Sequence, residues 1–166
     1  MGMHNHLRDI VKVLKTDETL LRLLYYPPED LAKNVPDPLD VRLKNILEMD
    51  IVYQVKIRNE HIYLSPKADD LDTKHLCRIY AYAGRRRPNS NYLTADQEII
   101  VDILCHFDYE NGDLRSMRIA DRINELICLE RVTGMGRVDY VGGGQINCPK
   151  NYTGYQHIFK TVGFKK

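Results

Sequence analysis

The stretch from His75 to Leu129 limits the fold most, because it contains two long β-type runs and one amphipathic helix in a fixed order. Both runs, residues 75–83 and 96–107, alternate between two faces with the two-residue period of a strand. A polar loop joins them, so the pair predicts a hairpin. One face of each run is apolar: Cys77, Ile79, Ala81 and Ala83 in the first, and Ile99, Val101, Ile103, Cys105 and Phe107 in the second.

The helix predicted over residues 114–129 follows this hairpin directly. Its apolar stripe consists of Met117, Ile119, Ala120, Ile123, Leu126 and Ile127, and Asp113 is placed to cap its N-terminus. An amphipathic helix after a hairpin buries its stripe against one face of the sheet. We therefore predict a helix packed on the hairpin, with the apolar face of the second run buried.

The rest of the chain supplies further helices and strands around this unit. Helices are predicted over residues 7–15 and 18–25, the second capped by Thr16 or Asp17 and ended by Pro27-Pro28. A third is predicted from Leu39, Leu43, Ile46 and Leu47. Ile51, Tyr53, Val55 and Ile57 alternate as in a strand, and two more strands are predicted over residues 137–141 and 155–164.

These patterns predict an α+β fold, a mostly antiparallel sheet packed by helices. We expect one domain over residues 1–166, with an N-terminal helical segment (about 5–49) and a sheet-and-helix core (about 50–166). A net charge of +1 argues against a protein that coats polyanions with its whole surface. The four cysteines form no CxxC pair, so we expect them reduced, and nothing indicates a signal peptide or a membrane partner.

Residues of possible chemical interest fit structural roles better than catalytic ones. Gly142, Gly143 and Gly144 are not followed by a helix start, so they predict a bulge or bend in a sheet rather than a phosphate loop. Glu98, Asp102 and His106 share one strand face, on which successive residues are about 7 Å apart. Ile100 and Leu104 lie between them, so the three cannot converge on one ion by themselves. A cross-strand pair of Arg78 with Asp102 is the simpler expectation. We predict no catalytic, cofactor-binding or metal-binding residues.

The loop between the two runs carries three consecutive arginines, Arg85, Arg86 and Arg87. A solvated turn is the default interpretation of such a run. The alternative is a compact cationic finger at the end of the hairpin, whose guanidinium groups bind carboxylates or phosphates. The candidate partner-binding residues are Arg85, Arg86, Arg87, Asn89, Asn91 and Tyr92.

Taken together, this order of elements resembles the tail terminator and tail-to-head joining proteins of long-tailed bacteriophages. The resemblance covers most of the chain from Leu7 onward. It lies in the segments KTDETLLRLL, AYAGRRRP, IIVDILCHF, DLRSMRIADRINELICL, VDYVGGGQI and GYQHIFKTVGF.

The resemblance implies a subunit that assembles with its own copies as a ring, usually of six, at the top of the tail tube. Such a ring stops tail polymerisation, contacts the tail tube protein and docks on the head connector or neck protein. Genomic DNA leaves through its bore without sequence-specific binding. The resemblance also implies no enzymatic activity, no cofactor, and a location in the virion after assembly in the host cytoplasm. In such a ring we expect the arginines to meet carboxylates of a neighbour, since tight binding to phosphates hinders sliding DNA.

Three alternatives remain open at this point. Within the same class, the chain is a head-completion or minor neck protein. In another class, it is a metal-dependent nuclease or other DNA-acting enzyme built around Asp102 and His106. A DNA-binding module that uses Arg85 to Arg87 is the third.

Overall fold

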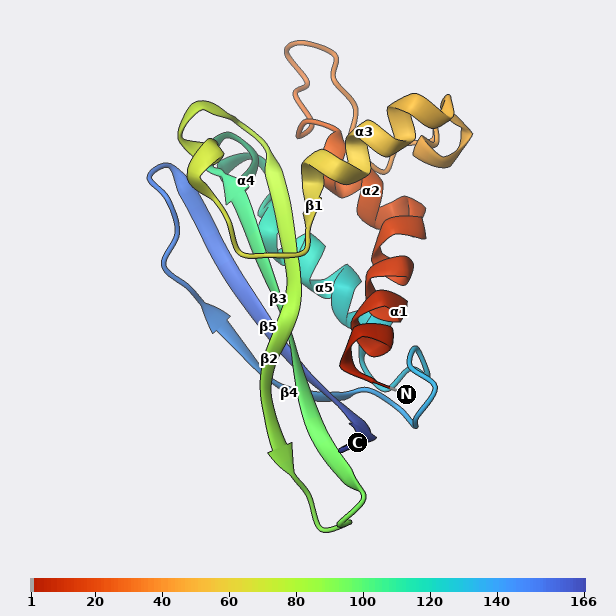
Figure 1. Ribbon diagram of the computed structural model, residues 1–166. Coiled ribbons are helices and arrows are strands. Elements are labelled where there is room, and N and C mark those ends of the chain that lie inside the picture. The colour runs from red at the N-terminus through yellow and green to blue at the C-terminus, as the bar shows by residue number, and fades with distance from the viewer. Residues whose placement is uncertain (1) are drawn as a thin grey trace.

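The computed structural model describes residues 2–166 and has an α+β fold, as the sequence predicts (Figure 1). The helices are α1 (Met3–Thr16), α2 (Glu18–Tyr25), α3 (Ile51–His61), α4 (Phe107–Asp113) and α5 (Arg115–Ile127), with short 3₁₀ helices at Ile46–Glu48 and Asp69–Thr73. The strands are β1 (Ile62–Tyr63), β2 (Cys77–Pro88), β3 (Thr94–His106), β4 (Asp139–Gln145) and β5 (Tyr152–Phe164). They form one sheet in the order β1-β2-β3-β5-β4, antiparallel except for the short β1–β2 pair.

The main core lies between one face of this sheet, called the inner face below, and helices α1, α2 and α5 (Figure 1). The first-run residues Cys77, Ile79 and Ala81 and the second-run residues Ile99, Val101, Ile103 and Cys105 are buried there, against α5 residues such as Ile123 and Ile127. The prediction of a helix packed on the hairpin is therefore confirmed.

Three of the residues predicted to be buried are exposed instead. Phe107 is 57% exposed because the strand ends at His106 and Phe107 begins α4. Met117 lies at the rim of the α5 stripe and is also exposed. Ala83 is exposed because it lies where β2 passes beyond the helices.

The opposite, outer face is covered over only part of its length. Near the start of β2, residues 64–76 and the segment before β5 cover it, and a second cluster forms there from Leu71, Leu76, Tyr80, Leu104 and Tyr152. The other end of the sheet, called the distal half below, extends past the helices as a long β2–β3 hairpin beside the end of β5 (Figure 1). This leaves a strip of sheet on which side chains of four strands are accessible.

Both N-terminal helices form: α2 has the predicted bounds, whereas α1 begins at Met3 rather than Leu7 and ends at Thr16. Asp17 caps α2 by accepting a hydrogen bond from the Leu20 amide at 2.8 Å. Arginines of α5 then fix α2 in place. The buried Arg115 donates to the carbonyls of Leu23 and Tyr26 at 2.6 and 2.7 Å, where the helix leaves its last acceptors unpaired. Arg122 pairs with Asp17 at the other end of α2 at 2.7 Å.

The strand predicted at residues 51–57 is wrong, because this segment is the helix α3. Asp50 accepts a hydrogen bond from the Val52 amide at 2.9 Å and so starts the helix. Gln54 donates to the carbonyls of Leu47 and Met49 just before it. Only Ile57 and His61, one helical turn apart, are buried. The alternating apolar residues at 51, 53 and 55 lie exposed on the helix surface.

Two further expectations on the helices are wrong. No long helix forms over residues 39–47, where turns held by Asp37 and Asp40 lead to the short 3₁₀ helix Ile46–Glu48. Asp113 is not the N-cap of α5. Leu114 takes that position in a left-handed conformation, with φ of 52°, and the Asp113 carboxylate instead binds Arg115 and Arg118.

The last two strands occur as β4 and β5, close to the predicted ranges. The β4–β5 register shifts between Tyr140 and Gly142, which confirms the predicted bulge at the glycine run. Gly143 is required there, since a Cβ atom at this position would lie 2.8 Å from the Gln156 carbonyl oxygen.

Candidate functional site

The three arginines do not lie in the hairpin loop, contrary to the sequence interpretation. They are the last residues of β2 before Pro88, and the loop is limited to residues 89–93. The strand extends this far because Arg86 and Arg87 pair with Gln97 and Asp96 of β3 after a bulge that follows Ala83. A finger of three arginines is therefore not formed.

Because side chains alternate along the strand, Arg86 points to a different face of the sheet from Arg85 and Arg87. Arg86 reaches across to the end of β5 and donates to the Phe164 carbonyl, so it holds the hairpin against that strand. Arg85 and Arg87 lie on the outer face and are exposed. Within residues 2–166, neither of their guanidinium groups has a carboxylate partner at ion-pair distance.

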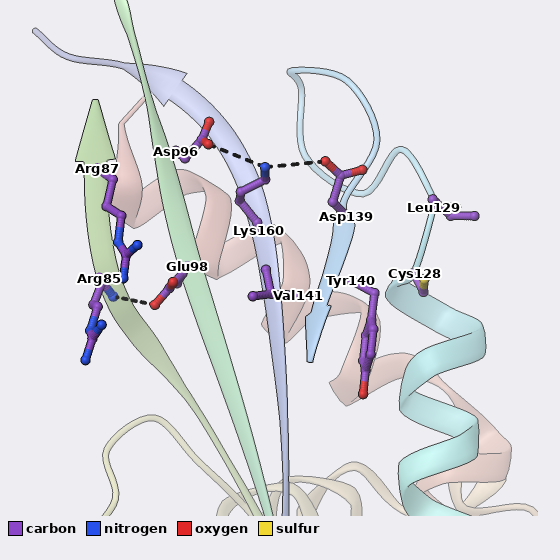
Figure 2. A pocket seen from close by; sticks show the side chains of 10 residues that line it. All are labelled: Arg85, Arg87, Asp96, Glu98, Cys128, Leu129, Asp139, Tyr140, Val141 and Lys160. Atoms are coloured by element: carbon purple, nitrogen blue, oxygen red, sulfur yellow. Dashed lines mark hydrogen bonds and ion pairs between the residues drawn. The ribbon is translucent and has the colours of Figure 1, made fainter. Parts of the chain in front are cut away.

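Arg85 and Arg87 belong to a set of charged side chains that crosses the distal half of the outer face (Figure 2). We call this set the charged row; its members are Arg85 and Arg87 of β2, Asp96 and Glu98 of β3, Lys160 of β5 and Asp139 of β4. The Lys160 ammonium lies 3.4 Å from Asp96 and 3.9 Å from Asp139, and the Glu98 carboxylate accepts from the Arg85 amide at 3.2 Å.

The sign of the charge alternates from strand to strand along this row. In the spatial order β2-β3-β5-β4 the charges are positive, negative, positive and negative. Lys160 lies between Asp96 and Asp139 and contacts both carboxylates. At one edge of the sheet, the Arg85 and Arg87 guanidinium groups have no carboxylate partner within residues 2–166. At the other edge, Asp139 has Lys160 on one side only and is 59% exposed.

A shallow depression of about 640 Å³ lies beside the row and continues around the β4 edge to the end of α5. Its apolar part consists of Leu129, Tyr140 and Val141, which are all exposed. Burial of the Tyr140 hydroxyl, with Tyr155 near it, raises the pKa of that phenol above its usual value. The distal half therefore combines paired charges with an apolar margin, as protein interfaces do.

The other candidate residues lie at the tip of the hairpin. Asn89 and Asn91 shape the loop: Asn89 accepts from the Asn91 amide and the Thr94 hydroxyl, and Asn91 accepts from the Leu93 amide. Tyr92 is 81% exposed and makes the projecting end. Five of the six predicted site residues are exposed, and Asn89 is half-buried. Arg86, Asn89 and Asn91 also form hydrogen bonds that hold the hairpin together.

Sequence reasoning missed Asp96, Lys160 and Asp139. Asp96 could have been predicted from the strand alternation, because it lies on the same face as Glu98. Lys160 and Asp139 join the row only because β5 pairs with β3 and β4 pairs with β5. These pairings join Glu98 to Lys160 across 62 residues of chain and Asp139 to Lys160 across 21. No local sequence pattern predicts the register in which these distant strands pair.

The expected pair of Arg78 with Asp102 is wrong. Asp102 accepts hydrogen bonds from Tyr82 and Gln156 at 2.6 and 2.7 Å, while the buried Arg78 binds Asp70 on the 3₁₀ helix and packs over the Tyr63 ring. Asp102 therefore forms a side-chain network across three strands and does not approach His106.

His106 instead meets His75 and Asp108 at the other end of the sheet. Both Nδ1 atoms lie close to one Asp108 carboxylate oxygen, at 3.1 and 3.2 Å, and the three residues offer atoms within 4.8 Å of one another. The two rings stack at 4.0 Å with an interplanar angle of 13°. Lone pairs of imidazole lie in the ring plane, so those of parallel stacked rings do not converge on one ion. The arrangement is that of two stacked rings held by Asp108: His106 Nδ1 accepts from the Asp108 amide at 3.2 Å, and His75 Nδ1 hydrogen-bonds to the Asp108 carboxylate. Metal binding here requires a ring to rotate.

These features define an α+β protein with an accessible charged surface at the free edges of its sheet. No helix in residues 2–166 combines the length and apolar character that crossing a bilayer requires.

Comparison with known proteins places the chain in the YomW family, whose profile matches residues 17–161. The SPbeta prophage-derived uncharacterized protein YomW of Bacillus subtilis (strain 168) is 32% identical over 162 residues, which cover 95% of this chain and 94% of that protein. The chain belongs to this family, and the prophage origin of the relative links the family to bacteriophages.

Proposed function

We propose that the protein is a structural component of a phage particle at the head–tail interface, where it caps the tail tube as a ring and docks the tail to the head connector. Its partners in this role are its own copies, the tail tube protein and the connector or neck protein, with DNA passing through the bore. It acts by assembly and needs no cofactor.

The observation that carries this proposal is the charged row of the distal half. A row that alternates in sign, with free arginines at one sheet edge and an exposed aspartate at the other, has the charge pattern of a surface that binds protein. A DNA-coating surface has one sign of charge, whereas this row contains three cationic and three anionic side chains. The prophage origin of the YomW relative supports the phage setting.

The first experiment is deletion of the gene from an inducible prophage that carries it, followed by electron microscopy of the particles. Loss of a tail terminator should give tails of uncontrolled length that are not joined to heads. Tails of normal length beside separate heads would favour the alternative position, a head-completion or minor neck protein. Infectious particles of normal shape would contradict both positions.

The alternative of another class is a metal-dependent DNA-acting enzyme, or a DNA-binding module. The cluster of His75, His106 and Asp108 is the one observation in residues 2–166 that favours the enzyme. Incubation of the purified protein with DNA and Mg²⁺, Mn²⁺ or Zn²⁺ tests it directly. Cleavage that disappears in a His106→Gln variant would favour the enzyme over the assembly protein.

A further inference from the structure

The sheet has two edges in its distal half without a strand partner in the described part of the chain. β1 pairs with β2 only at Ile79 and Tyr80, so residues 81–88 of β2 pair on one side alone. At the opposite edge, β5 is the only strand that pairs with β4 in residues 2–166. Just before β4, Val138 exchanges backbone hydrogen bonds with Leu129 and Glu130, so the open part of this edge lies within β4 itself, residues 139–145. Edge strands of this kind present a row of unpaired amides and carbonyls to which another strand can pair.

We infer that the β4 edge of one copy pairs with the β2 edge of a second copy, so that the sheets of neighbouring subunits become continuous. This inference rests on the proposed assembly of the protein with its own copies, and it names the surface through which that assembly occurs. The contact is head-to-tail, since each copy uses two different edges. Repetition of such a contact closes into a ring when the rotation between copies allows it.

Strand direction is compatible with this contact. Neighbouring strands in the order β2-β3-β5-β4 are all antiparallel, so β2 and β5 run one way and β3 and β4 the other. When the second copy has the same orientation as the first, its β2 lies antiparallel to β4. The antiparallel ladder then continues across the boundary with the same face outward.

Charge complementarity selects the second copy as the partner strand. The row ends at β4 with Asp139, so the alternation of sign requires a cation on the next strand. Arg85 and Arg87 of β2 are such cations, and neither guanidinium has a carboxylate at ion-pair distance within residues 2–166. Both ends also lie at the same level of the sheet: Asp139 is opposite Lys160, Lys160 is opposite Glu98, and Glu98 meets the Arg85 amide.

Pairing of two identical edges is less favourable. In a twofold β2–β2 contact over residues 81–88, the arginines of both copies gather at the centre and repel each other. A twofold antiparallel β4–β4 contact places Asp139 opposite the far end of the strand, at Gln145, so the second copy offers it no cation. Of these three contacts, only the head-to-tail one brings the anionic and the cationic end of the charged row together.

Carbodiimide cross-linking of an Arg87→Lys variant tests this contact, because the reagent joins carboxylates to amines that touch. Equal amounts of ¹⁴N- and ¹⁵N-labelled full-length protein are mixed before the reaction. We expect a cross-link of Asp139 to the lysine at position 87 in peptides of mixed isotope, which can arise only between chains. The link of Asp139 to Lys160 within one chain, never of mixed isotope, is the internal control. An added Asp139→Asn change must remove both.

Neutral variants measure the contribution of the charges to association. Arg85→Gln/Arg87→Gln and Asp139→Asn should each raise the concentration needed for assembly roughly tenfold, and the combined variant should lose little more, because the two sets contact each other. Lys56→Gln/Lys150→Gln, which changes two exposed lysines outside both edges, is the matched control and should assemble as the wild type does. Circular dichroism verifies that each variant is folded.

The outcomes separate this inference from the proposed function. Oligomers without the mixed-isotope cross-link, insensitive to the neutral variants, would overturn the edge contact and leave the ring to form through another surface. A protein that stays monomeric at all concentrations and shows no such cross-link would overturn the edge contact and the ring together.

Discussion

At the scale of single residues, the buried Arg78 depends on one carboxylate. Its guanidinium is fully buried, packs over the Tyr63 ring at 3.9 Å and donates to Asp70 at 2.8 and 3.1 Å. These hydrogen bonds lower the pKa of Asp70 from 3.8 to about 2. The contribution of the pair to stability is therefore complete above about pH 4 and is lost as the pH falls towards the folded-state pKa.

The Asp70→Asn variant should lower the free energy of unfolding by about 1–3 kcal/mol, since a buried cation loses its counter-charge. Partial exposure of the Asp70 side chain, 38%, favours the lower end of that range. Urea denaturation at neutral pH gives the value. The matched control is Asp72→Asn on the same 3₁₀ helix, whose carboxylate is exposed. Equal stability of the two variants would refute the assigned role of Asp70.

Two buried histidines, His61 and His157, give the free energy of unfolding a second dependence on pH. His61 hydrogen-bonds to the Cys77 carbonyl at 2.6 Å and His157 to the Ala120 carbonyl at 2.9 Å, and burial lowers the pKa of both imidazoles below 6.5. The folded state holds them neutral, whereas the unfolded chain binds protons as the pH falls through 6.5. The unfolding free energy should therefore decrease from about pH 7 to pH 5.

The His157→Gln variant should show a smaller decrease over this range than the wild type, measured as urea unfolding at several pH values. His4→Gln serves as control, because His4 is exposed on α1 and its replacement should leave the slope unchanged. An unchanged slope in His157→Gln would mean that this imidazole does not titrate differently in the two states.

The arginine run shows what residue-level patterns predict and what they miss. Its accessibility and its placement at the end of the hairpin follow from sequence alone. Its division into Arg86, bound to the Phe164 carbonyl, and the outward Arg85 and Arg87 depends on where β2 ends and on a bulge after Ala83. Three like charges followed by proline are typical of a loop, and pairing with Asp96 and Gln97 overrides that preference.

At the scale of elements, Arg115 connects α5 to the C-terminal end of α2. Replacement by methionine keeps much of the side-chain volume but leaves the carbonyls of Leu23 and Tyr26 without this donor, and Asp113 with Arg118 alone. We expect a loss of about 3 kcal/mol, because two carbonyls lose a charged donor at once.

Thermal and urea unfolding of Arg115→Met measure this loss, and hydrogen exchange should show the largest increase in α2. Arg131→Met, at an exposed position in the segment after α5, is the matched control and should stay within about 0.5 kcal/mol of the wild type. A loss of similar size in both variants would contradict the anchoring role of Arg115.

Elements with one apolar stripe and clear ends were predictable. Helix α2 has the predicted bounds because Asp17 and the Pro27-Pro28 pair mark both ends. Helix α3 was not predictable in this way, because Ile51, Tyr53 and Val55 alternate as in a strand, and on the helix they are exposed. Its helical state depends on the Asp50 cap and on Gln54 contacts with the preceding turn. The Gln54 contacts depend on how the preceding turn packs against the helix, which the spacing of apolar residues in the sequence does not show.

At the scale of the whole molecule, the fold class was predictable from the sequence, whereas the arrangement of the charged row across the sheet was not. Strand β3 pairs with β5, and β5 pairs with β4 on its other side. The charged row therefore combines side chains that lie between positions 85 and 160 of the sequence. Helices on one face leave the distal half of the other face accessible (Figure 1). This asymmetry is the basis for proposing that the protein works through association.

The solution mass of the purified full-length protein tests that central claim most directly. Light scattering and native mass spectrometry over a range of concentrations should give one discrete assembly whose mass is a small multiple of 19.4 kDa, as a closed ring requires. Its formation should weaken with added salt, because opposite charges across the subunit boundary are screened. A protein that remains at 19.4 kDa at every concentration, or that forms only open-ended aggregates of mixed size, would contradict the account.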